Sequence, residues 1–413
     1  MSDTTDDHRV IAPVPRITIQ AFCETADIAD AIQAAAGDRR MQKAHVKVQM
    51  GGAPAAVEAY RNAPTPNVIL IEADRDRPAI LGYLDTLAEF CDAGTKVVVV
   101  GHVNDVILYR ELMRRGISEY LIAPVAVLDF VRTTSELFSG PSADPVGRTI
   151  AVVGAKGGVG ASTVAHNLAW AIGQGLGAPT AIADLDIAFG TAGLDFNQDP
   201  PQGIAEAVFA PDRLDGNLVD RLLSKCSDNL SLLATPAVLD RTADLTESAL
   251  DGLIDILRGM IPNIVLDVPH LWTAWAKRML ISADEIAIVA APELASLRNA
   301  KNLFELLRQS RPNDRKPKVI LNQVGVPKRP EISAAEFAKA LGTELAAILP
   351  FDAQLFGTAA NNGQMIAEVQ PSGKAAETFA DLAAAITGRA EPKRSRVSFL
   401  DPILAKLARR KAS

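Results

Sequence analysis

Apolar and polar residues form a regular alternation of strand and helix patterns along most of this chain. From Arg16 onward, short apolar runs are separated by longer stretches with the period of an amphipathic helix. In the first part these patterns predict strands at 17–22, 44–49, 67–72, 96–100 and 119–122, and helices at 26–36, 53–61, 78–91, 103–115 and 127–138. Strands that alternate with helices pair in parallel between helical layers, so residues 16–139 are expected to form an α/β domain.

The same alternation resumes after residues 140–148, whose glycines and prolines indicate a linker. Strands are predicted at 149–154, 181–186, 230–234, 264–267, 285–291, 318–322 and 346–351. The main helices are predicted at 247–260, 271–281, 294–310, 332–341 and 373–387, with short helices between 195 and 230. Residues 149–388 should therefore contain a mostly parallel sheet of about seven strands, with ligands at the carboxyl ends of the strands. Residues 1–15 are expected to be a disordered lead, and residues 389–413 a separate basic tail.

The composition is that of a globular cytoplasmic protein. Of the 413 residues, 48% are hydrophobic, which supplies ample core, and the net charge of −7 argues against a general affinity for nucleic acid. The three cysteines are isolated, which suits a reducing compartment and offers no metal framework. The polar, acidic N-terminus is no signal peptide, and no apolar run approaches the ~20 residues of a membrane-spanning helix.

A glycine-rich stretch between the strand at 149–154 and a helical pattern is the strongest candidate site. Strand, glycine-rich turn and helix N-terminus together form the layout that binds phosphates through backbone N–H groups. The residues expected to bind ATP are Lys156, Gly157, Gly158, Val159, Gly160, Ala161, Ser162 and Thr163. The Ser162 hydroxyl is placed to meet Mg²⁺, whereas Ala161 stands where a phosphate-binding lysine usually precedes such a serine.

Two further strands end in carboxylates that suit this loop. Asp184 and Asp186 close the strand at 181–186, and Asp267 closes the strand that begins at 264. Strand-end carboxylates beside a phosphate loop are what a hydrated Mg²⁺ and an attacking water require. Each could instead cap a turn, but the three together with the loop favour an ATP and Mg²⁺ site.

These motifs resemble those of the deviant-Walker ATPases that include MinD and ParA, over roughly residues 148–388. The sequences Ala161-Ser-Thr163 and Asp184-Leu-Asp-Ile-Ala-Phe-Gly190 look closest to the CpaE/TadZ branch, which assembles Flp (tight-adherence) pili. The resemblance implies that Lys156 reaches across a homodimer to the partner's phosphates. It also implies that Asp186 positions water and Mg²⁺ and that Asp267 is the Walker-B-like acid. By the same resemblance, Asn322 lies at the adenine edge and Pro350-Phe351 form the base-side loop.

The N-terminal strand–helix units resemble the response-regulator receiver, a flavodoxin-like fold. The resemblance places the phosphoacceptor position at Glu72, the hydroxyl position at Gly101-His102 and the lysine position at Ala123. Without the usual residues no aspartyl phosphate can form, so a degenerate receiver used for protein contacts is expected. Glu72 could mimic a phosphorylated state, although a surface carboxylate at a strand end is the preferred interpretation.

The resemblance implies an ATP-binding, dimerising localisation or assembly factor for a Flp type IV pilus or related secretion machinery. Because Ala161 cannot neutralise charge on the leaving oxygens, the protein should be at most a slow ATPase. Expected partners are pilus assembly or secretion proteins, such as a motor ATPase or a polar landmark, at the pole or the inner-membrane periphery, with no specific nucleic acid. The alternative is an active MinD/ParA-type ATPase that positions DNA or division machinery. A third alternative, a redox donor like the nitrogenase iron protein, needs two bridging thiolates per subunit. Only Cys226 lies in this domain, so the sequence argues against that alternative.

The tail from 392 to 413 carries most of its charge as lysine and arginine. A helix there would place Phe399, Leu400, Ile403, Leu404 and Leu407 on one face and basic residues opposite. Such a helix binds a membrane surface, as in the MinD relatives, or docks on protein, and both alternatives remain open.

Overall fold

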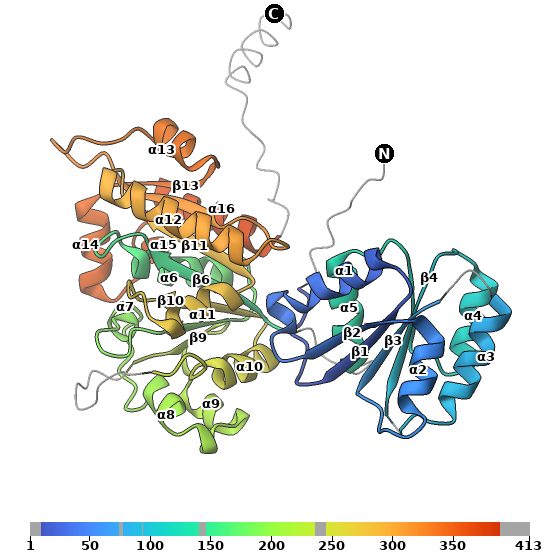
Figure 1. The fold of residues 1–413 in the computed structure, drawn as a ribbon. Coiled ribbons are helices and arrows are strands. Elements are labelled where there is room, and N and C mark those ends of the chain that lie inside the picture. The colour runs from blue at the N-terminus through green and yellow to red at the C-terminus, as the bar shows by residue number, and fades with distance from the viewer. Residues whose placement is uncertain (1–9, 74–76, 93, 140–145, 236–244, 389–413) are drawn as a thin grey trace, which may run out of the picture.

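The computed structural model describes residues 10–73, 77–92, 94–139, 146–235 and 245–388, which contain two β-sheets (Figure 1). The first sheet has the order β2-β1-β3-β4-β5, and all its strands are parallel. Its strands are β1 (Thr18–Cys23), β2 (His45–Met50), β3 (Val68–Glu72), β4 (Lys96–Gly101) and β5 (Glu119–Ile122). We call residues 10–139 the five-stranded unit.

Helices cover both faces of this sheet, which explains why β3 is apolar and buried along its length. On one face lie α1 (Ala26–Ala36) and α5 (Val127–Phe138), and on the other α2 (Gly52–Tyr60), α3 (Arg77–Ala88) and α4 (Val106–Arg114) (Figure 1). A short 3-10 helix, η1 (Arg39–Met41), follows α1. Helix α4 begins later than predicted because the Asp105 carboxylate accepts hydrogen bonds from two backbone N–H groups and caps it there.

The second sheet has eight strands in the order β13-β12-β11-β6-β10-β7-β9-β8. They are β6 (Arg148–Gly154), β7 (Thr180–Asp184), β8 (Ser224–Ser227), β9 (Leu230–Leu233), β10 (Asn263–Val268), β11 (Glu285–Ala290), β12 (Lys318–Val324) and β13 (Leu345–Pro350). The seven predicted strands are present and parallel. The eighth is β8, an edge strand antiparallel to β9, in a segment where only short helices were expected. We call residues 146–388 the eight-stranded unit.

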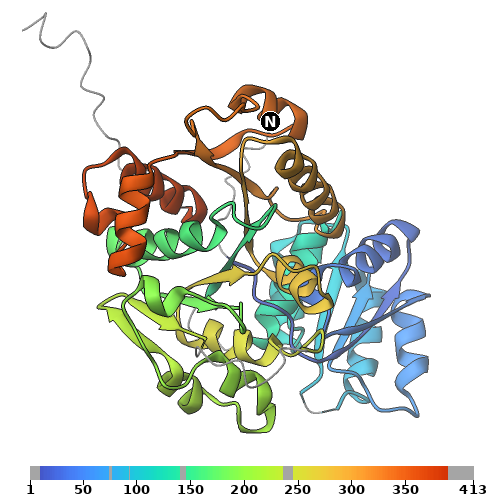
Figure 2. The same ribbon diagram turned by 90° about the vertical axis from the view of Figure 1, so that its left-hand side faces the viewer.

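Two layers of helices enclose the second sheet (Figure 2). One layer comprises α6 (Ala161–Trp170), the π-helix η2 (Ala171–Gly175), α7 (Ala192–Asp195), α14 (Ala353–Asn362), α15 (Ile366–Val369) and α16 (Lys374–Thr387). The other comprises α8 (Ile204–Phe209), α9 (Gly216–Leu222), α10 (Asp251–Met260), α11 (Ala274–Ser282), α12 (Leu294–Ser310) and α13 (Ala334–Leu341), with the 3-10 helix η3 (Pro211–Arg213) after α8. Among the described residues, no helix is both long and apolar enough to cross a bilayer.

Two expectations require correction. Residues 10–15 are not a disordered lead, because Val14 is fully buried and its N–H donates to the Arg40 carbonyl at 2.8 Å. Glu72 is not a surface carboxylate, because it is fully buried. It accepts hydrogen bonds from the N–H groups of Glu24 and Thr25 and from the Thr25 hydroxyl, and it contacts His102 Nε2 at 3.0 Å. Burial alone would raise the pKa of Glu72, but these hydrogen bonds outweigh burial, so the pKa of Glu72 is lowered. Residues 1–9, most of the expected linker and the basic tail lie outside the described residues.

Candidate functional site

The glycine-rich stretch forms a loop between β6 and α6, at the carboxyl edge of the sheet. Gly158 and Gly160 have φ values of +79° and +80°, which favour glycine. The first backbone hydrogen bond at the start of α6 is donated by Val164 N to Gly160 O. The N–H groups of Ala161, Ser162 and Thr163 precede it and therefore have no carbonyl partner within the helix. The helix N-terminus and loop thus bring unpaired donors together.

Side-chain amides bind the carbonyl groups of this loop. Gln323 Nε2 donates to Gly158 O at 2.9 Å, and Asn322 Nδ2 donates to Val159 O at 2.9 Å. Asn299 Nδ2 donates to Ala155 O at 3.0 Å. Because the C=O and the following N–H of a trans peptide point in opposite directions, carbonyls held by these amides leave the N–H groups facing the other way. The loop is therefore a preformed set of donors for an anion.

Lys156 supplies the positive charge of the loop, and in the single chain its Nζ pairs with Glu293 Oε1 at 2.5 Å. Glu293 lies directly before α12. The Lys156 side chain is 44% exposed, so its ammonium group is accessible from solvent. Ser162 and Thr163 lie partly exposed in the first turn of α6 beside Ala161.

The predicted carboxylates lie together on adjacent strands. Asp184 on β7 is in register with Asp267 on β10, and both side chains are almost completely buried. The Asp184 carboxylate accepts hydrogen bonds from the N–H groups of Asp186 and Ala192, each at 3.1 Å. Burial raises the pKa of Asp184 to about 7, and the nearby charge of Asp267 adds to this effect. A bound cation would relieve this repulsion, because it favours the ionised form of both carboxylates.

Asp186 begins the turn that follows β7. Its carboxylate accepts a hydrogen bond from Phe189 N at 3.1 Å, and its carbonyl accepts one from Gly190 N. Gly190 is required here, because a Cβ would lie 2.3 Å from an oxygen of Asp184. The turn keeps Asp186 partly exposed beside the two buried carboxylates.

A buried histidine, which no sequence motif indicated, completes the cluster. His166 on α6 is fully buried, with Nδ1 at 2.7 Å from Asp195 Oδ2 and Nε2 at 3.4 Å from Asp267 Oδ2. Burial lowers its pKa, but the two carboxylates outweigh burial and raise it to about 10. The imidazolium thus links α6, α7 and β10. A polar residue on an otherwise buried helix was the only local signal for it.

The arrangement suits a magnesium ion that binds few protein atoms. No set of three or more metal-ligating side chains is present in the part of the chain that the structure describes. Mg²⁺ usually retains several waters and binds through one or two carboxylates and the substrate phosphates. Asp186, Asp267 and Ser162 would hold such an ion, which would neutralise charge on the phosphates.

The residues expected at the base are less closely associated with the loop. Asn322 is buried, and its amide is already bonded to Val159 O and to Gln323 N. Pro350 ends β13, which is separated from β6 by two strands, and its neighbour Phe351 is 40% exposed. Asn322 therefore supports the phosphate loop, and among the described residues no hydrogen bond joins Phe351 to that loop.

Comparison with known proteins first identifies the superfamily to which this chain is similar. The ParA family profile, described as a NUBPL iron-transfer P-loop NTPase, matches residues 145–193, which include β6, the loop and α6. The septum site-determining protein MinD of Bacillus subtilis (strain 168) is 25% identical over 262 residues, 60% of this chain and 91% of that protein. MinD from Pyrococcus horikoshii OT3, solved with Mg-ADP, shares the fold at 23% identity and a TM-score of 0.52, covering 58% of this chain and 95% of that structure. The fold is that of a MinD/ParA-type P-loop protein.

A further similarity gives the branch. The pilus assembly protein CpaE from Caulobacter crescentus CB15 is 49% identical over 31% of this chain and 98% of that chain, with a TM-score of 0.30. The chain belongs to the CpaE-type proteins of the MinD/ParA superfamily.

Proposed function

We propose that this protein is an ATP- and Mg²⁺-binding assembly factor for a Flp-type pilus or a related secretion apparatus, and that ATP acts mainly by stabilising its homodimer. The observation that carries the nucleotide site is the fixation of the loop carbonyls by Asn299, Asn322 and Gln323, which leaves the N–H groups free for phosphate. The mechanism that follows is one of binding and orientation. The loop N–H groups and the N-terminus of α6 hold the phosphates, and Asp186 orients a water beside them.

Hydrolysis should be slow because Ala161 offers no charge to the leaving oxygens. Backbone donors and the helix dipole act on the ground state and the transition state alike, whereas the missing lysine would act most strongly where charge develops. The rate should therefore lie well below the roughly 1 s⁻¹ of ordinary enzymes. A turnover of several per second that Asp186→Ala abolishes would instead indicate an active ATPase of the positioning type.

The dimer proposal rests on Lys156. Its partly exposed ammonium group is paired with Glu293 at the rim of the site, so a partner's phosphates could replace that carboxylate as its ligand. Lys156→Ala should reduce ATP-dependent dimerisation, measured by sedimentation velocity, while ADP binding to the monomer is retained. Lys301→Ala is the matched control, because Lys301 pairs with Glu305 on the exposed side of α12 and should leave dimerisation unchanged. Equal dimerisation of all three proteins would contradict the role of Lys156 across the dimer.

The remaining assignments extend this proposal. Residues 16–139 would serve as a receiver-like contact domain, which the parallel order β2-β1-β3-β4-β5 supports. Its partners would be pilus assembly or secretion proteins, at the cell pole or the inner-membrane periphery. Deletion of residues 392–413 should reduce co-sedimentation with anionic liposomes and leave ADP binding intact. Unchanged co-sedimentation would leave the docked-helix alternative.

A further inference from the structure

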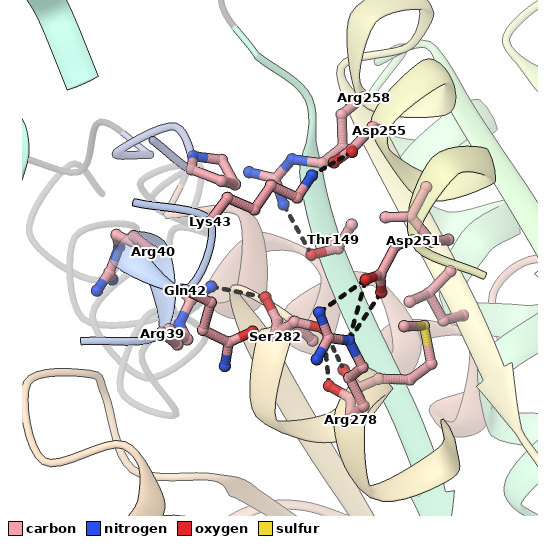
Figure 3. A pocket seen from close by; sticks show the side chains of 15 residues that line it. Arg39, Arg40, Gln42, Lys43, Thr149, Asp251, Asp255, Arg258, Arg278 and Ser282 are labelled. Atoms are coloured by element: carbon pink, nitrogen blue, oxygen red, sulfur yellow. Dashed lines mark hydrogen bonds and ion pairs between the residues drawn. The ribbon is translucent and has the colours of Figure 1, made fainter. Parts of the chain in front are cut away.

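A small cavity lies between the two units, beside Thr149 near the start of β6 (Figure 3). The phosphate loop follows the other end of this strand. Its volume is about 60 Å³, and Lys43 reaches it from the five-stranded unit while Arg258 and Arg278 reach it from the eight-stranded unit. Since about 10–15 Å³ of such volume is enough for one water, the cavity has room for a small polyatomic ion or a few waters.

Buried ion pairs surround this cavity and join the units. Arg39 of η1 pairs with Asp284 at 3.1 Å and with Asp314 at 2.7 Å, and Arg258 pairs with Asp284 at 2.7 Å. Burial would raise the pKa of Asp284, but Arg258 and Arg39 hold it down to about 2. The members of this network, each with a side chain less than a tenth exposed, are Arg39, Arg40, Arg258, Arg311, Asp38, Asp284 and Asp314.

The network contains four guanidinium groups and three carboxylates, so it carries one positive charge in excess. At the cavity, Lys43 pairs with Asp255, and Arg278 pairs with Asp251 at 2.7 Å and with the more exposed Glu247 at 3.8 Å. A buried excess charge is costly unless a counter-charge accompanies it. Among these seven buried side chains, one guanidinium therefore has no carboxylate of its own to offset its charge.

Arg258 shows where that anion would bind. Its Nη1 donates to Thr149 Oγ1 at 3.1 Å and to Asp284 Oδ2 at 2.7 Å. Its Nε and Nη2 are buried and have no hydrogen-bond partner among the described residues. These two N–H groups form one edge of the guanidinium, the edge that binds two oxygens of a carboxylate or phosphate side by side.

We propose that this interdomain cavity binds a phosphate oxyanion, either free phosphate or the terminal phosphate of a larger molecule, through the Nε–Nη2 edge of Arg258 with Lys43 alongside. The anion would neutralise the excess charge and would contact both units, so its binding would strengthen their association. This site is separate from the nucleotide site and does not depend on the function proposed above.

The test uses the full-length protein with inorganic phosphate at constant ionic strength, in saturating Mg-ADP to occupy the phosphate loop. Isothermal titration calorimetry should detect phosphate binding to the wild type. Arg258→Lys keeps the charge but removes the bidentate edge, so it should weaken binding at least tenfold. Arg278→Lys is the matched control, because the same edge of Arg278 is already filled by Asp251, and it should bind phosphate like the wild type.

Two outcomes would overturn the proposal, namely no binding by the wild type and equal binding by Arg258→Lys. If Arg258→Lys does not unfold cooperatively, Lys43→Gln decides, since its side chain is 36% exposed and tolerates replacement. An unchanged affinity in Lys43→Gln would then reject the site. Methyl phosphate distinguishes the sources, because equal binding of this ester favours a larger ligand and its exclusion favours the free ion.

Discussion

Three glycines of the phosphate loop form a series in which an added methyl group meets different obstacles. At Gly157 a Cβ would meet nothing within 4 Å, and φ lies outside the left-handed region. At Gly158 the space is also open, but φ is +79°. At Gly160, φ is +80° and a Cβ would lie 2.6 Å from Asn322 Nδ2. Alanine at these positions therefore separates the cost of the backbone conformation from the cost of displacing the amide.

The expected changes in the free energy of unfolding follow from these contacts. Gly157→Ala should be neutral or stabilise by up to about 1 kcal/mol, because it reduces the entropy of the unfolded chain. Gly158→Ala should cost about 1–2 kcal/mol for the left-handed conformation. Gly160→Ala should add about 1–3 kcal/mol, because Asn322 must leave the Val159 carbonyl.

Urea unfolding of the nucleotide-free protein measures the series, and calorimetry with Mg-ADP measures its effect on binding. Since Asn322 holds the Val159 carbonyl away from the ligand, Gly160→Ala should also weaken Mg-ADP binding. If Gly157→Ala destabilised the protein as much as Gly160→Ala, the contacts described here would not decide the loop's conformation. Equal stability of Gly157→Ala and Gly158→Ala would reject the requirement for glycine at positive φ.

Three further predictions concern buried charges. Burial lowers the pKa of His166, but Asp195 and Asp267 raise it to about 10, so its stabilisation is complete below pH 6.5 and is lost as pH rises towards 10. His166→Gln should cost about 3–5 kcal/mol near neutral pH and remove that slope in urea unfolding; a parallel slope in both proteins would contradict the assignment. Asp284, whose folded pKa is about 2, stabilises above pH 3.8 and loses this effect as pH falls, so the deficit of Asp284→Asn should shrink between pH 4 and 2. Glu72→Ala should lower the free energy of unfolding by at least about 2 kcal/mol, because it leaves two backbone N–H groups without an acceptor. Glu72→Gln keeps an acceptor for them and should lower it by less than about 1 kcal/mol. Equal losses in the two variants would show that hydrogen bonding is not the role of Glu72.

The sequence was sufficient for the elements whose signals are local. Apolar runs located the seven parallel strands of the large sheet, because strands covered on both faces are apolar throughout. Strand β8 was missed because its residues Ser224–Ser227 are mostly polar and lie at the sheet edge, where no period distinguishes them from a loop. The ordering of residues 10–15 was missed because it depends on a backbone bond to Arg40, which no local pattern reveals.

The same distinction holds within the site. The spacing of the glycines and of the strand-end carboxylates indicates their role in the sequence itself. Parallel strands then bring their carboxyl ends to one edge of the sheet. The residues that fix the loop carbonyls come from α12 and β12, more than a hundred positions away. The pairs Lys156–Glu293 and His166–Asp195 likewise depend on how α12 and α7 approach the loop. Such partners follow from the tertiary packing and carry no signature of their own.

Strand β6 connects two places with opposite electrostatic needs. Near its start, Thr149 bonds Arg258 and Asp284, where buried cations exceed anions by one. At its end lies the phosphate loop, beside in-register carboxylates that repel each other. The seven residues of β6 span about 20 Å, more than twice the Debye length of about 8 Å in physiological salt, so direct attraction between the two sites is weak. A rigid strand between two sites does not couple them by itself, because coupling requires an element with two arrangements that both ligands bias. The junction of the two units, where Arg39 of η1 pairs with Asp284 and Asp314, is the place where such an element would have to act. An effect of nucleotide on the interdomain anion would therefore be transmitted by the relative position of the units.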